Sequence, residues 1–421
     1  MKRLSLILIS FILIFACSTN VDQQKDSKTN ETSKEELSIY NLDPETYIPK
    51  EFGIFDFVND DLEVIPLETN LDCIVSYPNP THIVVEDEFI LVGSSPPGMK
   101  PGEVLLFSKD GQFRHKFGTG GRGPGEHVGW QPRKIRYYPK DSTVMVYWGG
   151  GHSTIQLFDL NGDFKYQIEL PYPFLIMDNI ERWSNSTWIV TGSDDWGNTF
   201  GTVTPADSIR FALFSGNGDI IKEIRRTNYP SLNKLQEKVF SRWSRPYNYN
   251  GTWKFNLRGN DTLFSIGAKN LKPDAILTTL TVEFPIMIRV LRETEAFFML
   301  KIAEPLEETM GNKMWELEYY TVLLDKSSGK TFSIEFVDDA FFLLDNFSMY
   351  DGKFMEKRFQ WRNDRLSFAL SPLQWMELTE GLDRSKLRPT IREKLKVLEG
   401  LKEDDNLIVF TFTLKDEIDF D

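Results

Sequence analysis

Short alternating runs of apolar and polar residues recur along the chain from about residue 47 to the end. Four pairs of such runs flank a tight turn that ends in glycine. They are LLFSKDGQFRHKF (105–117), IQLFDLNGDFKYQIEL (155–170), FALFSGNGDIIKEI (211–224) and TVLLDKSSGKTFSIEF (321–336). A period of two is typical of β-strands, and glycine supplies the positive φ that a tight hairpin needs. The pattern therefore predicts four β-hairpins.

The spacing of these hairpins indicates a repeat. Their glycines, Gly111, Gly162, Gly218 and Gly329, are separated by 51, 56 and 111 residues. The long gap holds a further strand pair, NDTLFSI with NLKPDAILTTL. A repeat of about 50 residues built from short strands is typical of a β-propeller blade, whose small sheet can bury its faces only against its neighbours. Residues 47–421 would hold six or seven blades, and we expect six because helical insertions take some of the length.

The two ends of this region predict how the ring closes. The segment NLIVFTFTLK (406–415) is a strong strand, and LEVIPLET (62–69) is its natural N-terminal counterpart. Pairing strands from opposite ends removes the exposed edge of an open ring. We therefore expect both segments to be required for folding.

Helices are few. The segment SKLRPTIREKLKVLEGL (385–401) places Leu387, Ile391, Leu395 and Leu398 on one apolar stripe, and SLNKLQEKVF (231–240) repeats this more briefly. The predicted fold class is all-β, a six-bladed β-propeller, with seven blades as the alternative and short helices as decorations.

The N-terminus predicts export and a lipid anchor. Lys2 and Arg3 precede a short apolar run that ends in Ala16-Cys17, as in a secretory signal, and the run is too short for a spanning helix. The tetrapeptide Ile14-Phe15-Ala16-Cys17 resembles the lipobox of bacterial lipoproteins, in which the cysteine is acylated, for example with palmitate. Ser18 in place of Asp favours the outer membrane, facing either the periplasm or the cell surface. An ordinary signal peptide with a chance cysteine is the alternative.

These segments divide the chain into three parts. We predict a signal peptide over residues 1–16, a polar tether over 17–46 and a propeller domain over 47–421. Cys73 is the only cysteine besides Cys17, so it has no disulfide partner, and its apolar context predicts a buried strand residue.

The net negative charge of the chain makes some binding partners less favourable than others. Lys and Arg number 48 against 62 Asp and Glu, a net charge of -14 that becomes -16 without Lys2 and Arg3. A negative body repels the phosphates of nucleic acids. We expect a monomeric body that contacts the membrane through its lipid and binds a glycan or a protein.

The segment GTGGRGPGE (118–126) matches G-x-G-x-x-G, the phosphate-binding pattern of dinucleotide-binding folds. The match fails because Pro124 and Gly125 stand where a helix should begin. We instead predict a blade-linking turn in which the glycines permit unusual backbone angles and Glu126 accepts free backbone N–H groups. Arg122 would pair with Glu126 or face a ligand at the mouth of the propeller. The predicted turn motif comprises Gly118, Gly120, Gly123, Pro124, Gly125 and Glu126.

Ten tryptophans raise the question of carbohydrate binding, because indole faces stack on sugar rings. We expect most of them to fill the wedges between blades. Trp130, Trp148 and Trp196 are the candidates for ligand contact because they stand beside glycines at predicted strand ends.

Motifs for other chemistry are missing from the sequence. The four histidines stand far apart, so no zinc site and no metal ligands are predicted. There is no nucleophile elbow and no marked triad, so no catalytic residues are predicted. Calcium held in a central channel by residues from several blades is the one cofactor that we retain as an alternative.

Several phrases resemble a known family. EVIPLET (63–69), HIVVEDEFILVG (82–93), the GPGE turn, NDTLFSI and the closing LKEDDNLIVFTFTLK (401–415) are similar to the six-bladed β-propeller lipoproteins of Bacteroidetes, relatives of NHL-type propellers. Leu407 departs from the usual proline of the closing phrase, and the segment after Glu126 departs from the usual aromatic residue. The resemblance implies the fold and an envelope location, but a propeller hosts many activities.

Three hypotheses of function follow. The first is a lipid-anchored binding or scaffold module for a glycan, peptide or protein. The second is a lactonase-type hydrolase with a divalent cation in the channel, and the third is a purely structural envelope protein. Inward carboxylates and Asn around the channel would favour the enzyme, whereas aromatic and Arg side chains there would favour binding.

Overall fold

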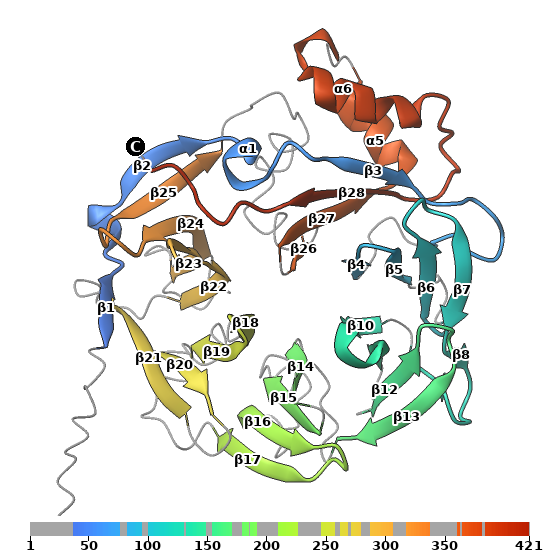
Figure 1. Cartoon of the computed structure of the whole chain (residues 1–421), viewed down its shortest axis with the longest axis horizontal. Coiled ribbons are helices and arrows are strands. Elements are labelled where there is room, and N and C mark those ends of the chain that lie inside the picture. The colour runs from blue at the N-terminus through green and yellow to red at the C-terminus, as the bar shows by residue number, and fades with distance from the viewer. Residues whose placement is uncertain are drawn as a thin grey trace, which may run out of the picture. The chain divides into compact units, whose positions relative to one another are not determined.

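Six small β-sheets form a ring in the computed structural model (Figure 1), so the protein is a six-bladed β-propeller. Leu37–Asp421 form one compact unit. The described residues are 37–75, 82–94, 100–129, 132–148, 154–170, 179–184, 186–191, 209–225, 246–256, 262–267, 271–278, 287–305, 317–336, 360–362, 364–380 and 384–420. The predicted fold class, with six blades rather than seven, is confirmed.

Blades 1 to 3 are four-stranded antiparallel sheets whose strands follow the order of the chain from the centre outward. Blade 1 comprises β4 (Ile83–Val85), β5 (Phe89–Ser94), β6 (Glu103–Ser108) and β7 (Phe113–Phe117). Blade 2 comprises β10 (Pro132–Tyr138), β11 (Thr143–Trp148), β12 (Thr154–Asp159) and β13 (Phe164–Glu169). Blade 3 comprises β14 (Asn179–Ser184), β15 (Thr187–Thr191), β16 (Ile209–Ser215) and β17 (Ile220–Arg225).

Blades 4 to 6 each take one strand from the N-terminal segment. Blade 4 comprises β18 (Tyr247–Tyr249), β19 (Thr252–Asn256), β20 (Thr262–Ile266), β21 (Leu271–Thr278) and, outermost, β1 (Ser38–Asn41). Blade 5 comprises β22 (Met287–Glu293), β23 (Phe297–Pro305), β24 (Leu317–Asp325), β25 (Thr331–Phe336) and, outermost, β2 (Ile48–Phe52). Blade 6 comprises β26 (Gln360–Arg362), β27 (Arg365–Leu370), β28 (Ile408–Thr413) and, outermost, β3 (Glu63–Pro66).

The predicted hairpins and the closing strand pair are confirmed. Gly111, Gly162, Gly218 and Gly329 all have positive φ, between 70° and 88°, at the turns before β7, β13, β17 and β25. The pair β20 and β21 is antiparallel, as expected for NDTLFSI and its partner. The ring closes where β3 pairs antiparallel with β28.

The N-terminal segment also runs along the outside of three successive blades. β1 pairs parallel with β21, β2 pairs parallel with β25, and β3 then closes blade 6. We call residues 38–66 the N-terminal belt. Between its strands lie the 3-10 helix η1 (Pro44–Thr46) and α1 (Ile54–Phe57), whose Ile54, Phe55 and Phe57 are buried. The belt therefore connects blades 4, 5 and 6.

The core consists of apolar clusters at the junctions between neighbouring blades. At the junction of blades 3 and 4, for example, Ile189 and Phe211 pack with Phe255 and Ile266. Described residues form one such cluster at each of the six junctions. Each sheet thus buries both faces, which explains why the repeat must continue around a closed ring.

A helical insertion lies between β27 and β28. It comprises α5 (Pro372–Thr379), η6 (Arg384–Lys386), α6 (Pro389–Leu395) and η7 (Lys396–Leu398). Ser371 and Gln374 form a capping box at the start of α5, and Pro389 occupies the first turn of α6. The predicted apolar stripe is confirmed, because Leu387, Ile391, Leu395 and Leu398 are all buried. The predicted helix is split into these shorter pieces, and α5 was not predicted.

Two expectations need correction. The tether was expected to reach residue 46, but β1 and η1 belong to the propeller unit because β1 hydrogen-bonds to blade 4 and Leu42 is completely buried. Cys73 is buried as expected, yet it lies in a turn after β3, where its thiol donates to the carbonyl of Glu68. The helix expected over 231–240 lies outside the described residues. No helix in the described part of the chain is both long and apolar enough to cross a membrane.

Candidate functional site

The GTGGRGPGE segment connects blades 1 and 2. Its strands β8 (Thr119–Gly120) and β9 (Glu126–His127) pair parallel, and the carboxylate of Glu126 accepts a hydrogen bond of 2.6 Å from the N–H of Gly123. Gly125 has a φ of +76°, and a Cβ there would lie 2.9 Å from the Cβ of Phe164. The segment is thus a turn that needs glycine for both backbone angle and space. Arg122 is exposed at its tip.

Trp148 forms part of the wall of this turn. Its side chain is only 2% exposed and stacks on the ring of His127, with ring centroids 3.4 Å apart. The indole N–H donates to Oε1 of Gln156, whose amide donates in turn to the carbonyl of Glu126. An indole held in this way presents no free face to a sugar. Trp130 and Trp196, the other tryptophans expected to contact ligand, lie outside the described residues.

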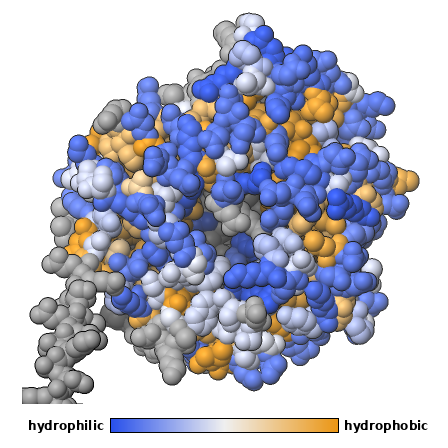
Figure 2. Space-filling view, in the orientation of Figure 1, coloured by the Kyte–Doolittle hydropathy of each residue, from blue (hydrophilic) through white to orange (hydrophobic). Residues whose placement is uncertain are grey.

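The strands nearest the centre of the ring are β4, β10, β14, β18, β22 and β26 (Figure 1), which we call the inner strands. Figure 2 shows that the face in view is hollowed at the centre and that hydrophilic residues edge the hollow. Charged side chains meet at two blade junctions, and at each junction at least one of them comes from an inner strand. These two clusters, rather than the glycine-rich turn, form the candidate site.

The first cluster joins blades 2 and 3 and consists of Lys134, Arg136 and Glu181. The Nζ of Lys134 lies 2.8 Å from Oε1 of Glu181, and the Nε and Nη2 of Arg136 donate to the same carboxylate at 3.0 and 2.8 Å. Burial alone would raise the pKa of Glu181, but Arg136 and Lys134 outweigh it and lower the pKa to about 2. The carboxylate is therefore ionised at neutral pH, and the cluster carries one excess positive charge.

The same junction holds a further arginine on an aromatic wall. The guanidinium of Arg182 lies 5.3 Å from the ring centroid of Tyr138 and 5.9 Å from that of Trp188, within the range of cation–π attraction. Its Nη1 also lies 2.6 Å from the carboxylate of Asp141. Blade 2 and blade 3 thus contribute cations and aromatic rings to one junction.

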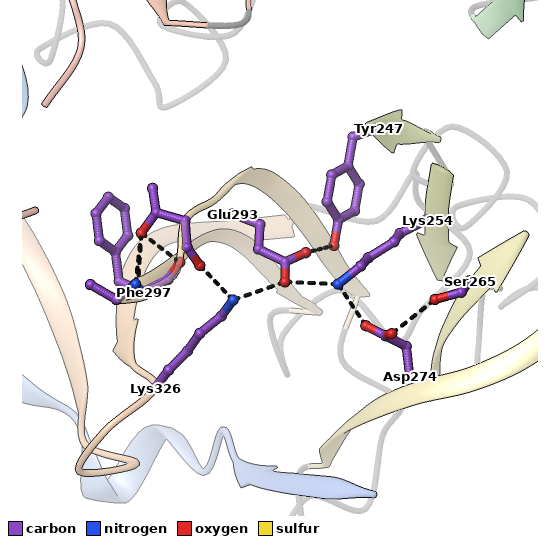
Figure 3. Close-up of polar contacts among 9 residues, drawn as sticks. Tyr247, Lys254, Ser265, Asp274, Glu293, Phe297 and Lys326 are labelled. Atoms are coloured by element: carbon purple, nitrogen blue, oxygen red, sulfur yellow. Dashed lines mark hydrogen bonds and ion pairs between the residues drawn. The ribbon is translucent and has the colours of Figure 1, made fainter. Parts of the chain in front are cut away.

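The second cluster joins blades 4 and 5 (Figure 3) and consists of Tyr247, Lys254, Asp274, Glu293 and Lys326. Glu293, at the end of β22, is the central member. The carboxylate accepts a hydrogen bond of 2.7 Å from Tyr247 and contacts the ammonium groups of Lys254 and Lys326 at 2.9 and 2.8 Å. Lys254 also pairs with Asp274, at 2.7 Å. Described charges within this cluster balance.

Burial and ion pairing set the protonation states in the second cluster. Burial, aided by Glu293, raises the pKa of Tyr247 well above its usual range, so the phenol stays protonated and can donate. Burial would lower the pKa of Lys254, but hydrogen bonds to Asp274 and Glu293 outweigh it and raise the pKa. The pKa of Lys326 is lowered, chiefly by burial. The net pKa shifts of the two lysines are therefore opposite, although burial lowers the pKa of both and they share one carboxylate.

The first cluster, with its excess positive charge, suits the holding of an anion, and neither cluster suits metal binding. Glu181 and Glu293 are each already held by two cations, which compete with any metal ion for the same oxygens. Among the described residues no group of three or more His, Cys, Asp or Glu could hold a metal ion. The lactonase-type alternative thus gains no set of residues from the described part of the chain and stays a prediction.

The sequence contained a signal for these clusters that our sequence analysis did not use. Lys134 and Arg136 flank Ile135 in the run KIRYY (134–138), and Lys254 lies between Trp253 and Phe255. Charges inside strands that are otherwise apolar indicate either a solvated face or buried ion pairs. Only the arrangement of blades decides between the two, because the partners come from different blades.

The comparisons with known proteins agree with the fold. A family model named "Domain of unknown function (DUF4934)" matches residues 38–413. A Bacteroides fragilis protein that is classed as exported has a similar structure, with a TM-score of 0.55 and 16% identity, over 88% of this chain and 100% of that one. A member of the DUF4221 family from Bacteroides vulgatus has a TM-score of 0.46 and 11% identity, over 85% and 97% of the two chains.

No curated protein sequence matches the chain. The match to the family model spans all six blades, from β1 in the N-terminal belt to the end of β28. The chain therefore belongs to the DUF4934 family of β-propellers, a domain of unknown function.

Proposed function

We propose that this protein is a lipid-anchored binding module of the cell envelope, and that it holds an anionic part of a glycan, peptide or partner protein at the centre of the ring. The observation that carries the proposal is the charge of the inner strands. Within their described bounds, seven Lys or Arg residues stand against two Glu, whereas the whole chain has 48 against 62. The basic residues are Arg133, Lys134, Arg136, Arg182, Arg289, Arg292 and Arg362.

Electrostatics supports an anionic ligand. Charges of one sign that line a hollow with walls of low dielectric constant focus the field and concentrate ions of the opposite sign. The protein surface elsewhere is net negative and would repel the same ligand, so the centre is the favoured place for it. Arginine on an aromatic wall, as at Arg182, is also a common feature of protein recognition surfaces.

The envelope location is supported by the lipobox at Cys17 and by the likeness to a Bacteroides protein classed as exported. An anchored, exported propeller meets anionic glycans and proteins rather than nucleic acids. The binding role is favoured over the hydrolase because Lys and Arg outnumber Glu on the inner strands, and because the described carboxylates there, Glu181 and Glu293, are already ion-paired.

The test is direct binding of the lipidated protein to arrays of acidic and neutral glycans and peptides. We expect binding to ligands that carry carboxylate or sulfate groups. The variant Arg136→Gln should bind about tenfold more weakly, because a hydrogen bond to a charged group contributes about 1.5 kcal/mol or more. Lys134 still pairs with Glu181 in this variant, so the fold should persist, and thermal melting checks that it does.

The matched control is Lys165→Gln, which removes one exposed positive charge from the outermost strand of blade 2. Equal weakening by the two substitutions would contradict a central site. Binding to neutral ligands alone would contradict the proposal that the ligand is anionic, but it would still support a binding role. Affinity capture of the native protein followed by mass spectrometry identifies protein partners, and failure of both experiments would favour a purely structural role.

A further inference from the structure

The second part of the helical insertion of blade 6, from η6 to η7, carries a concentration of positive charge in an acidic protein. Residues 384–398 contain six Lys or Arg and one Glu. Without this segment the chain has 42 basic and 61 acidic residues. In Figure 1 the insertion projects beyond the outline of the ring beside β3, and in Figure 2 the projecting part is mainly hydrophilic. A projecting element can touch a flat surface before the rest of the ring does.

The insertion is held rigidly, so its charges have fixed positions. Leu387, Ile391 and Leu395 are buried in the core at the junction of blades 5 and 6. The guanidinium of Arg388 lies 3.7 Å from the ring centroid of Phe55 in the N-terminal belt, and the hydroxyl of Thr390 donates to Asp60 at 3.0 Å. Because the apolar side of α6 faces the core, its charged side must face solvent.

The outward side forms a defined surface, which we call the basic patch. Arg384, Arg388, Arg392, Lys394 and Lys396 are all exposed, and Val397 is 54% exposed among them. Lys396 pairs with the one acidic residue of the segment, Glu393, at 2.5 Å. Lysine and arginine around an exposed apolar side chain are the features by which a helix contacts a membrane surface.

We propose that the basic patch docks the propeller onto a membrane surface rich in anionic lipid headgroups. Charge complementarity selects this occupant, since headgroups attract Lys and Arg close to the surface while the net negative remainder of the chain is repelled. The attraction therefore fixes which side of the ring faces the membrane. This inference rests on the membrane anchoring in the proposed function, because docking through a few charges is weak and requires that the membrane is held nearby.

The experiment measures sedimentation with vesicles that contain 30% phosphatidylglycerol in phosphatidylcholine, at about 0.1 M salt. The protein is the chain from residue 17 onward with Cys17→Ser, which lacks lipid but retains every described element. We expect partial sedimentation that falls as salt is raised. The variant Lys394→Glu/Lys396→Glu should bind at least about 30-fold more weakly, because each lysine lost near an anionic surface removes about a factor of five and each new carboxylate is also repelled.

The control variant Lys140→Glu/Lys330→Glu makes the same charge change at two exposed turn residues outside the insertion. It should bind as the parent does, and equal loss in both variants would overturn the proposal. Equal sedimentation with pure phosphatidylcholine, or none with either vesicle, would also overturn it. None of these outcomes contradicts the predicted lipid anchor, because acylation of Cys17 is measured separately.

Discussion

At the scale of single residues, packing shows whether a residue that the sequence singled out has a structural role. Trp148 was a candidate for ligand contact, and the structure instead uses it as a stacking partner for His127. The same turn needs Gly118, because a Cβ there would lie 3.1 Å from the Trp148 ring. Gly118 and His127 of this turn and Trp148 of β11 thus form one packed unit.

His127 makes this unit sensitive to pH. Burial lowers its pKa to about 4, against weaker opposing effects from the backbone at Gly129 and Gly102. The unfolded chain binds the proton with a pKa near 6.5, so stability should be full above pH 6.5 and should be lost as pH falls toward 4. The loss would be on the order of 3 kcal/mol.

We predict that His127→Phe reduces this loss. Phenylalanine keeps an aromatic ring against Trp148 but cannot take up a proton. Chemical denaturation of both proteins between pH 7 and 4 checks the prediction. Other groups titrate in both proteins alike, so the relevant quantity is the difference between the two curves. Parallel curves would contradict the prediction, because they would show that His127 takes up its proton equally in the folded and unfolded states.

At the scale of elements, the N-terminal belt extends the usual closure of a propeller. Closure requires only β3, yet β1 and β2 also extend blades 4 and 5. Both additions are parallel, whereas every pairing within the blades is antiparallel among the described strands. Buried Phe52, Phe55 and Phe57 tie the belt to the core of blades 5 and 6.

Stepwise truncation tests the belt. Removal of residues 1–36 deletes no described element and should leave a cooperative unfolding transition. Removal of residues 1–52 should lower stability by several kcal/mol, because burial of a large apolar side chain such as Leu42 or Phe52 contributes about 2 kcal/mol each. Removal of residues 1–66 should prevent folding, since β28 would lose its partner and present an open edge.

Circular dichroism and size-exclusion chromatography measure these outcomes. A monomeric, cooperatively folded protein without residues 1–66 would contradict the role of β3 in closure. Unchanged stability without residues 1–52 would show that β1 and β2 add nothing to the ring.

At the scale of the whole molecule, charge is distributed unevenly. The chain is acidic overall, while the inner strands and residues 384–398 of the helical insertion are basic. Self-repulsion of the acidic surface favours solubility, and the two basic regions direct anions to one central site and one projecting surface. The two proposed roles, binding of an anionic ligand and docking onto a membrane, therefore belong to two separate places on the molecule.

Lipidation is the prediction at this scale. The variant Cys17→Ala should lose labelled palmitate and should not be processed to the mature size, because the cysteine is both the acceptor and the marker of cleavage. Membrane fractionation and gel mobility of the two proteins measure the outcome. A variant that remained membrane-bound with acyl label would show that Cys17 is not the anchor.

The sequence by itself determined the hairpins, their spacing, the closing strand pair and the buried stripe of the insertion, because these depend on alternation and on glycine turns within short segments. It did not reveal β1, whose four residues Ser38–Asn41 carry too short a pattern to indicate a strand. The charged clusters also depended on the tertiary structure. Lys254 and Glu293 are 39 residues apart and on different blades. Their meeting depends on how the blades face one another around the ring, and no local pattern of residues encodes that geometry.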